Sequence, residues 1–285
     1  MPSAAYRHHD THTMPYEELP ENPVARRQLL WRDEATGACV QMSYGPPGFP
    51  PNVVKVLQAG PHRHFHNTVN ERHYVLAGDY PVWHWANLDD AGTRTVLRRH
   101  TYLENRPHTL HGVRPETVPA VATQMLVWNN GGGTSIFDKD AARETIDVPF
   151  DGSVRPNQAW RGPVLAQLDE RAWAPHPLVP GWKLKPVAAA ADGMPAVAQV
   201  SVPPDFAFSD AAPKIDGGAR RWLFLLSGDL AVQIASGAKT ESVMLREGHF
   251  LSWEEGARLT FGERAITGGG CVALCTGTDL AQPVA

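Results

Sequence analysis

Four histidines and one glutamate lie within twelve consecutive positions of the chain, in the stretch HRHFHNTVNERH that begins at His62. Neutral imidazole and carboxylate groups suit ions such as Fe, Zn, Mn, Ni or Cu, whereas a site without thiolates is less suited to purely structural zinc. Side chains alternate along a strand, so His62, His64 and His66 would share one face. Glu71 and His73 would share a face of the next strand. The spacing predicts a metal site with His62 at its rim or as an alternative first ligand, and the competing interpretation is a solvated polar segment.

A fourth ligand should come from a neighbouring strand, and the stretch ENRPHTLHGV (residues 104–113) offers His108 and His111. Eight of the 13 histidines lie between positions 62 and 111. This concentration favours a shared site over scattered core histidines.

The elements that must position these residues are predicted to be β-strands. The 25 glycines and 25 prolines are spread along the whole chain, and short runs rich in Val, Leu, Phe, Trp and Tyr lie between them. That composition is typical of a β protein with many turns. The best candidate for an amphipathic helix is GPVLAQLDERAW, residues 162–173.

The two halves of the chain repeat each other at an offset of roughly 150 residues, the size of a domain. Three blocks recur in the same order: GACVQMSYGPPGF (37–49) with MPAVAQVSVPPDF (194–206), YVLAGDYPV (74–82) with FLLSGDLAV (224–232), and VLRRHTYL (96–103) with MLREGHFL (244–251). An open sheet of such strands would leave its edges exposed, so a closed barrel of the jelly-roll type is the simplest solution. We therefore predict an all-β fold of two tandem barrels, in residues 1–150 and 151–285.

The residues of the first copy resemble the cupin family. His64, His66, Glu71 and Gly78 match the first cupin motif, H-x-H-x4-E-x6-G. The second motif is usually G-x5-P-x-G-x2-H, and here only its final ligand agrees, as His111. The resemblance implies a jelly-roll barrel with a metal ion held by His64, His66, Glu71 and His111.

Three positions of the second motif depart from the family pattern. His100 stands at the first glycine position, Arg106 at the proline position and His108 at the second glycine position. The flanking turns look like those of bicupins grouped with ChrR-type anti-sigma factors and acetylacetone-type dioxygenases. The extra helical zinc domain of the anti-sigma factors has no counterpart here, so a dioxygenase-like bicupin is the nearer relative.

The second copy lacks the ligand pattern. The repeat alignment places Arg221 at the position of Glu71 and Leu259 at the position of His111, and PKIDGGARR, which contains no histidine, replaces the H-x-H region. We therefore expect the C-terminal barrel to be a degenerate, metal-free cupin.

Other candidates near the site carry two interpretations each. His73 is either a partner of Glu71 that moves a proton or a hydrogen-bonded core histidine. Arg106 and His108 could orient an anionic substrate or stabilise their turn. Trp83 and Trp85 could wall an apolar pocket or belong to the core.

A site of three histidines and one carboxylate leaves two positions of a six-coordinate ion open, which is typical of catalytic sites. We predict a metal-dependent oxygenase of dioxygenase type that uses O2 and acts on a small oxygenated organic substrate, such as a dicarbonyl, an enol or a phenol-like molecule. Fe(II) is the favoured ion, and Zn, Mn or Ni also fit these ligands. The alternatives are a non-enzymatic metal-binding or ligand-binding sensor and a metal-dependent isomerase.

Net charge, apolar runs and cysteines indicate the expected partners and location of the protein. A net charge of -4 gives no basic surface for nucleic acid, and no stretch approaches the roughly 18 apolar residues of a membrane span. The expected location is the cytoplasm, where Cys39, Cys271 and Cys275 would be reduced and buried. We expect barrels of this kind to pair through edge strands as a homodimer.

Overall fold

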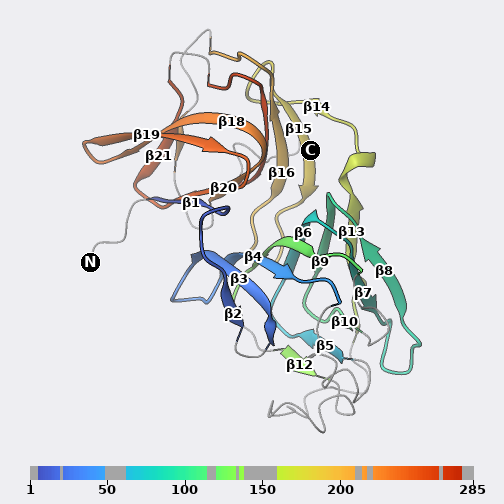
Figure 1. Cartoon of the computed structure of the whole chain (residues 1–285). Helices are drawn as coiled ribbons and strands as arrows, with labels where there is room; N and C mark the ends of the chain where they lie inside the picture. The colour runs from blue at the N-terminus through green and yellow to red at the C-terminus, as the bar shows by residue number, and fades with distance from the viewer. Residues whose placement is uncertain are drawn as a thin grey trace. The chain divides into compact units, whose positions relative to one another are not determined.

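The computed structural model describes residues 6–19, 22–48, 62–113, 120–132, 135–137, 159–208, 214–216, 221–262 and 266–277. Almost all regular structure in these ranges is β-strand (Figure 1). The chain divides into an N-terminal unit, Tyr16–Asp169, and a C-terminal unit that combines Met1–Pro15 with Glu170–Ala285. Both units are therefore all-β, as the sequence predicts.

The N-terminal unit contains two antiparallel sheets. The larger sheet has seven strands, in the order β13 (Val164–Gln167), β9 (Thr101–Asn105), β6 (Glu71–Ala77), β11 (Thr123–Asn129), β4 (Cys39–Gly45), β3 (Asn22–Arg32) and β2 (Glu17–Leu19). The smaller sheet has five strands, in the order β12 (Ser135–Phe137), β5 (His62–His66), β10 (His111–Val113), β7 (Tyr80–His84) and β8 (Thr93–Leu97). The histidines thus come from the smaller sheet, whereas Glu71 and His73 come from the larger one.

The C-terminal unit is built around a sheet of the same kind. Its main path runs through β1 (Tyr6–Asp10), β20 (His249–Trp253), β18 (Trp222–Ser236), β22 (Cys271–Thr276), β16 (Val197–Val202), β15 (Lys183–Ala188) and β14 (Ala174–Pro175). Off this path, β19 (Lys239–Arg246) and β21 (Ala257–Thr260) pair with β18, and β17 (Ile215–Asp216) pairs with β21.

The strand order confirms the internal repeat. The series β9-β6-β11-β4 in the N-terminal unit has the same topology as β20-β18-β22-β16 in the C-terminal unit. The matched sequence blocks fall on equivalent strands of these series, for example β4 and β16. Two jelly-roll barrels in tandem are therefore the architecture of this chain.

The edge strands of the two main sheets cross the boundary at residue 150 between the two expected domains, residues 1–150 and 151–285. The strand β13, from beyond residue 150, pairs with β9 of the N-terminal unit, and β1, from the start of the chain, pairs with β20 of the C-terminal unit. Residues 16–169 therefore group together, and the first 15 residues group with the second barrel.

The best candidate for an amphipathic helix, residues 162–173, does not form one. This segment forms the strand β13 and then a three-residue 3-10 helix, Leu168–Glu170. The backbone of β13 pairs with β9 from Thr101 to Glu104, so tertiary pairing overrides a short apolar pattern that fits either kind of element. The prediction for the cysteines holds in part: all three are free, but Cys39 is only half-buried.

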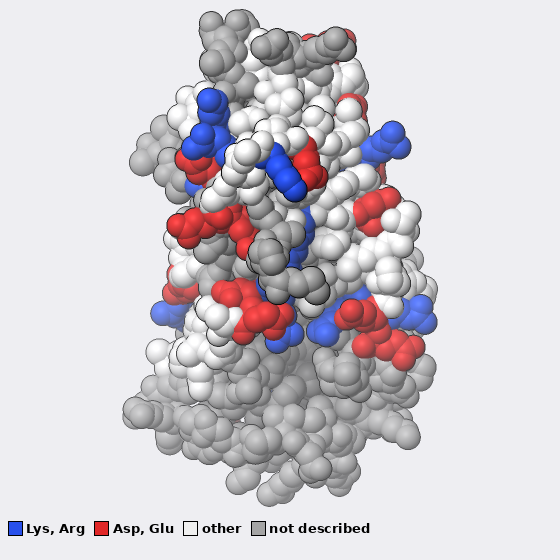
Figure 2. Space-filling model, turned by 90° about the vertical axis from the view of Figure 1, so that its left-hand side faces the viewer, with Lys and Arg blue, Asp and Glu red and all other residues white. Residues whose placement is uncertain are grey.

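Surface charge is mixed on the face that Figure 2 presents, where acidic and basic side chains are interspersed among the coloured residues. Within the described part of the chain, no helix has the length and apolarity that a membrane crossing needs. These two observations concern only the residues that the structure describes.

The repeat preserves a Gly-Asp step, which separates β6 from β7 in the N-terminal unit and lies within β18, next to a shift in its register, in the C-terminal unit. Gly78 has a φ of 77° and Gly228 a φ of 79°, the left-handed region that favours glycine. A Cβ atom at Gly78 would overlap the carbonyl oxygen of Ala122, and one at Gly228 would overlap that of Gly270. Both positions therefore require glycine, for conformation and for space.

We predict that Gly78→Ala and Gly228→Ala each lower the free energy of unfolding by about 3 kcal/mol, because left-handed strain and backbone overlap add up. Gly237→Ala is the matched control, since Gly237 has a φ of 59° but open space around it, and it should cost only about 1 kcal/mol. Urea unfolding measures all three variants. An equal decrease in the free energy of unfolding in all three variants would show that steric overlap contributes nothing.

Candidate metal centre

Three neighbouring strands of the smaller sheet place their histidines in one row. In the strand register, His64 of β5 pairs with His111 of β10, and His111 pairs in turn with His84 of β7. Cross-strand partners project to the same face of a sheet, so these three imidazoles lie side by side. His66, two residues beyond His64, projects to the same face.

Three of these histidines form a group that could hold a metal ion. The ligand atoms of His64, His66 and His111 all lie within 4.8 Å of one another, and this is the one such group among the described residues. The rings of His64 and His111 are 4.2 Å apart between centroids. His66 and His111 are buried, so the group is largely shielded from water.

The larger sheet faces this group with Glu71 and His73. The Oε2 atom of Glu71 lies 3.6 Å from Nε2 of His111 and 2.9 Å from Nε2 of His73. Burial raises the pKa of the Glu71 carboxyl, but the neighbouring imidazoles, chiefly that of His73, hold this pKa well below its usual range. Glu71 is therefore a carboxylate at the margin of the three-histidine group.

The hydrogen bond of His111 orients its ring as a ligand. Nδ1 lies 2.8 Å from the carbonyl oxygen of Thr109 and donates its proton there. In a neutral imidazole the lone pair is then on Nε2, which faces the Glu71 carboxylate. Two acceptors this close require a proton or a cation between them, and a metal ion bound by both meets that need.

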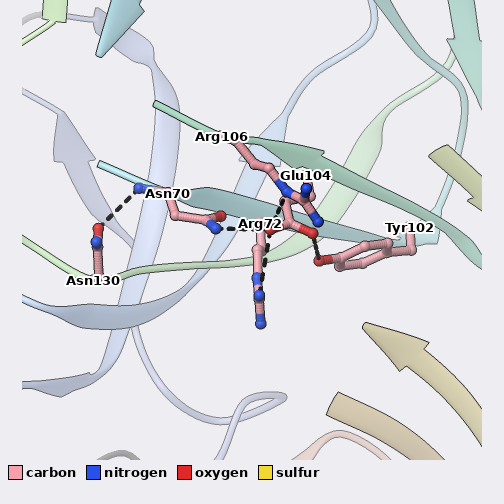
Figure 3. A network of polar contacts seen from close by, with 6 residues as sticks. All are labelled: Asn70, Arg72, Tyr102, Glu104, Arg106 and Asn130. Atoms are coloured by element: carbon pink, nitrogen blue, oxygen red, sulfur yellow. Dashed lines mark hydrogen bonds and ion pairs between the residues drawn. The ribbon is translucent and has the colours of Figure 1, made fainter. Parts of the chain in front are cut away.

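A buried polar network supports the strand that carries Glu71 (Figure 3). Glu104 accepts hydrogen bonds from Asn70 (2.7 Å), Arg72 (3.3 Å), Tyr102 (3.0 Å) and Arg106 (3.2 Å). The side chains of Arg72 and Glu104 are 0% and 2% exposed. Since side chains alternate on β6, this network lies on the face opposite to Glu71 and fixes the residues on either side of it.

Arg106 and His108 have contacts other than the three-histidine group. Arg106 binds Glu104, and its side chain is 38% exposed. His108 has a φ of 67°, its backbone N–H donates to the carbonyl of His66, and its ring stacks on Phe65. The structure thus brings together His64, His66, His111, Glu71 and His73. The side chain of His62 lies outside the described residues.

Trp83 and Trp85 lie on the other face of the smaller sheet. They flank His84 in β7 and stack on each other at 6.2 Å between centroids. Trp85 packs with Phe65 and Leu110 in a small apolar cluster. Of the two interpretations of these tryptophans, the structure supports packing rather than a wall of the histidine site.

Sequence reasoning missed His84 and Asn105. His84 is buried, and its Nε2 lies 3.1 Å from Oδ1 of Asn105 on β9. Burial lowers the pKa of the His84 imidazole to about 4, so the ring is neutral. The alternation in YPVWHW could have indicated that His84 faces away from both tryptophans, but only the strand register places it beside His111.

The C-terminal unit has apolar residues at the equivalent positions. Ile215 pairs with Leu259 there, as His64 pairs with His111 in the N-terminal unit, and both are buried. Inside this barrel, residues such as Trp182 and Phe261 leave a cavity of about 20 Å³, which is close to the space of a single water molecule. The second barrel is a packed core that retains the fold without the ligands.

No protein-family model and no curated protein matches the sequence. Solved structures do match in fold. A proposed dioxygenase from Nostoc punctiforme PCC 73102 has a TM-score of 0.63 and 15% identity, with 100% of this chain and 86% of that chain covered. Oxalate decarboxylase from Bacillus subtilis at pH 4.6 has a TM-score of 0.57 and 13% identity, with 98% and 78% covered.

A mutant of the Bacillus enzyme gives a similar result, with a TM-score of 0.59 and 12% identity over 99% of this chain and 80% of that chain. These likenesses agree with the all-β fold of two tandem jelly-roll barrels that the sequence predicts. At such low identities they show the fold alone, so the chemistry must be argued from the residues of this chain.

We predict that Glu104→Gln lowers the free energy of unfolding by about 3 kcal/mol near neutral pH, because Arg72 loses its buried counterion. Burial opposes ionisation of Glu104, but Arg72 and Asn70 lower its pKa in the folded state. A lowered pKa stabilises the fold above the unfolded pKa of about 4.3, and that contribution is lost as pH falls through the folded pKa.

The variant should therefore lose less stability than the wild type when urea unfolding is repeated at about pH 4. Tyr102→Phe is the matched control, since it removes one hydrogen bond from the same carboxylate and should cost about 1 kcal/mol. Parallel pH dependences for the wild type and Glu104→Gln would contradict this account.

Proposed function

We propose that this protein is a metal-dependent enzyme of the cupin type, with the ion held by His64, His66, Glu71 and His111. The observation that carries this proposal is the convergence of three imidazoles on one point, with a carboxylate facing them from the opposite sheet. The donor set of nitrogen and oxygen atoms fits Fe, Mn, Zn or Ni. The apolar replacements in the second barrel support the proposal, because the fold closes without these groups.

The reaction that we propose is an oxygenation of dioxygenase type, with Fe(II) as the favoured ion. When bound, the ion would supply two open coordination positions for an oxygen-bearing organic substrate and O2. Glu71 and His73, 2.9 Å apart, can hold and pass a proton at the edge of the site. The apolar interior of the N-terminal barrel, including Val75 and Leu103, would exclude bulk water.

A metal-dependent isomerase is a second candidate, and the contact between Glu71 and His73 favours it. A carboxylate beside an imidazole can take a proton from one carbon of an enolisable substrate and return it to another. Such a reaction needs no O2. A sensor that binds metal and ligand without turnover is the remaining alternative.

The metal site itself is tested by elemental analysis. We expect about one divalent ion per chain in the wild type, and less than about a tenth of that in His64→Ala and His111→Ala, because each substitution removes a ligand. His100→Asn is a matched control, since His100 is a histidine of the same barrel at a φ of 64°, which asparagine tolerates. Unchanged metal content in His111→Ala would refute the ligand assignment.

Oxygen uptake tests the reaction class. Anaerobically purified protein loaded with Fe(II) should consume O2 with at least one member of a panel of dicarbonyl, enol and phenolic compounds, and His111→Ala should not. Turnover of a panel member without O2 would favour the isomerase. Metal binding with neither uptake nor turnover would favour the sensor.

The last part of the proposal concerns location, oligomeric state and the class of ligand. We propose a cytoplasmic homodimer that acts on a small molecule rather than on nucleic acid. Light scattering of the purified protein should give twice the chain mass of 31.2 kDa, and a monomer mass would refute the dimer.

A further inference from the structure

A second polar bridge crosses the N-terminal barrel beside the proposed ion site. Nε2 of His84, on the smaller sheet, lies 3.1 Å from Oδ1 of Asn105, on the larger sheet. His84 is 7% exposed and Asn105 is 1% exposed. Burying polar groups is costly unless they are hydrogen-bonded, and this bond offsets the loss of water at Nε2 of His84 and at the amide oxygen of Asn105.

The strand registers place this bridge directly next to the metal group. His84 is the cross-strand neighbour of His111, and Asn105 is the cross-strand neighbour of Glu71. The contact between His111 and Glu71 and the bond between His84 and Asn105 are thus two adjacent links between the same two sheets. The bridge therefore lies beside the group on the β7 side.

The other ring nitrogen of His84 has no hydrogen-bond partner among the described residues. Its Nδ1 is buried and unpaired, while Nε2 is directed to the amide oxygen of Asn105. An amide oxygen only accepts, so the proton of the neutral ring is on Nε2 and Nδ1 is an acceptor. A buried acceptor without a donor calls for an explanation, and a bound ligand is one.

The charge of the site restricts that ligand. A divalent ion and the Glu71 carboxylate leave one net positive charge, and the nearby arginines are engaged elsewhere. Arg63 lies over the ring of Trp85, and Arg72 and Arg106 bind Glu104. A monoanion would neutralise the site, whereas a dianion would leave a net negative charge in a buried place.

We propose that His84 Nδ1 accepts a hydrogen bond from a ligand hydroxyl at the metal site, and that the site selects monoanions with two adjacent oxygens, one of which keeps its proton. α-Hydroxy carboxylates and the monoanions of catechols belong to this class. The inference rests on the proposed metal site and deepens it. Asn105 is a positioning residue, since it acts by fixing the tautomer and orientation of His84.

The test compares three small probes on the cobalt(II)-loaded protein, whose visible absorption reports ligands at the ion. Glycolate carries a carboxylate and a hydroxyl, methoxyacetate lacks the hydroxyl proton, and oxalate is a dianion. We expect glycolate to bind about tenfold more tightly than methoxyacetate, the effect of one buried hydrogen bond, and more tightly than oxalate.

Two variants separate the nitrogens of His84. In His84→Gln the side-chain amide can still donate to Asn105, but nothing replaces Nδ1, so the preference for glycolate should fall to about onefold. In His84→Asn the amide oxygen takes the place of Nδ1, so part of the preference should remain. The cobalt affinity should change by less than about threefold in both, and His100→Asn should keep the full preference.

Different results overturn different parts of the argument. A wild-type protein that binds no cobalt would refute the proposed function and this inference with it. Normal cobalt binding with equal affinities for glycolate and methoxyacetate, or an undiminished preference in His84→Gln, would refute only the role of His84. Tighter binding of oxalate than of glycolate would refute the charge selection.

Discussion

The candidate metal centre depends on one geometric constraint: cross-strand partners in a sheet project to the same side. His111 meets His64 for this reason, and no long loop has to position either residue. Glu71 approaches from the facing sheet because the barrel closes on itself. The same closure surrounds these polar groups with apolar side chains, so they are stable only when they satisfy one another or share an ion. Fold and chemistry are therefore linked by burial.

Rigidity at the centre is supplied from the reverse side of the sheet. The carboxylate of Glu104 collects four donors, and two of them, Asn70 and Arg72, are the chain neighbours of Glu71. A third donor, Arg106, begins the turn that leads to His111. The two ligand-bearing segments are thus held by one buried charge, which limits how far they can move apart.

The sequence was sufficient for the fold class, because the repeated blocks and their Gly-Asp steps recur in the same order as the equivalent strands. It also gave the three-histidine group, whose spacing follows strand alternation. It could not give the edges of the sheets, since β1 and β13 pair with residues at least 60 positions away in the chain. Nor could it place His84 or the donors of Glu104, because these contacts depend on register across strands rather than on any local pattern.

The origin of the edge strands has a consequence for how the chain is made. The strand β1 is synthesised before the N-terminal unit, yet its partner β20 follows more than 230 residues later. The strand β1 therefore lacks this partner while the N-terminal unit is synthesised. Conversely, the edge strand β13 of the N-terminal unit is synthesised only after residue 150, where the first copy of the repeat was expected to end. Dividing the gene between residues 150 and 151 would separate β13 from β9 and β1 from β20, so each product would have an unpaired sheet edge.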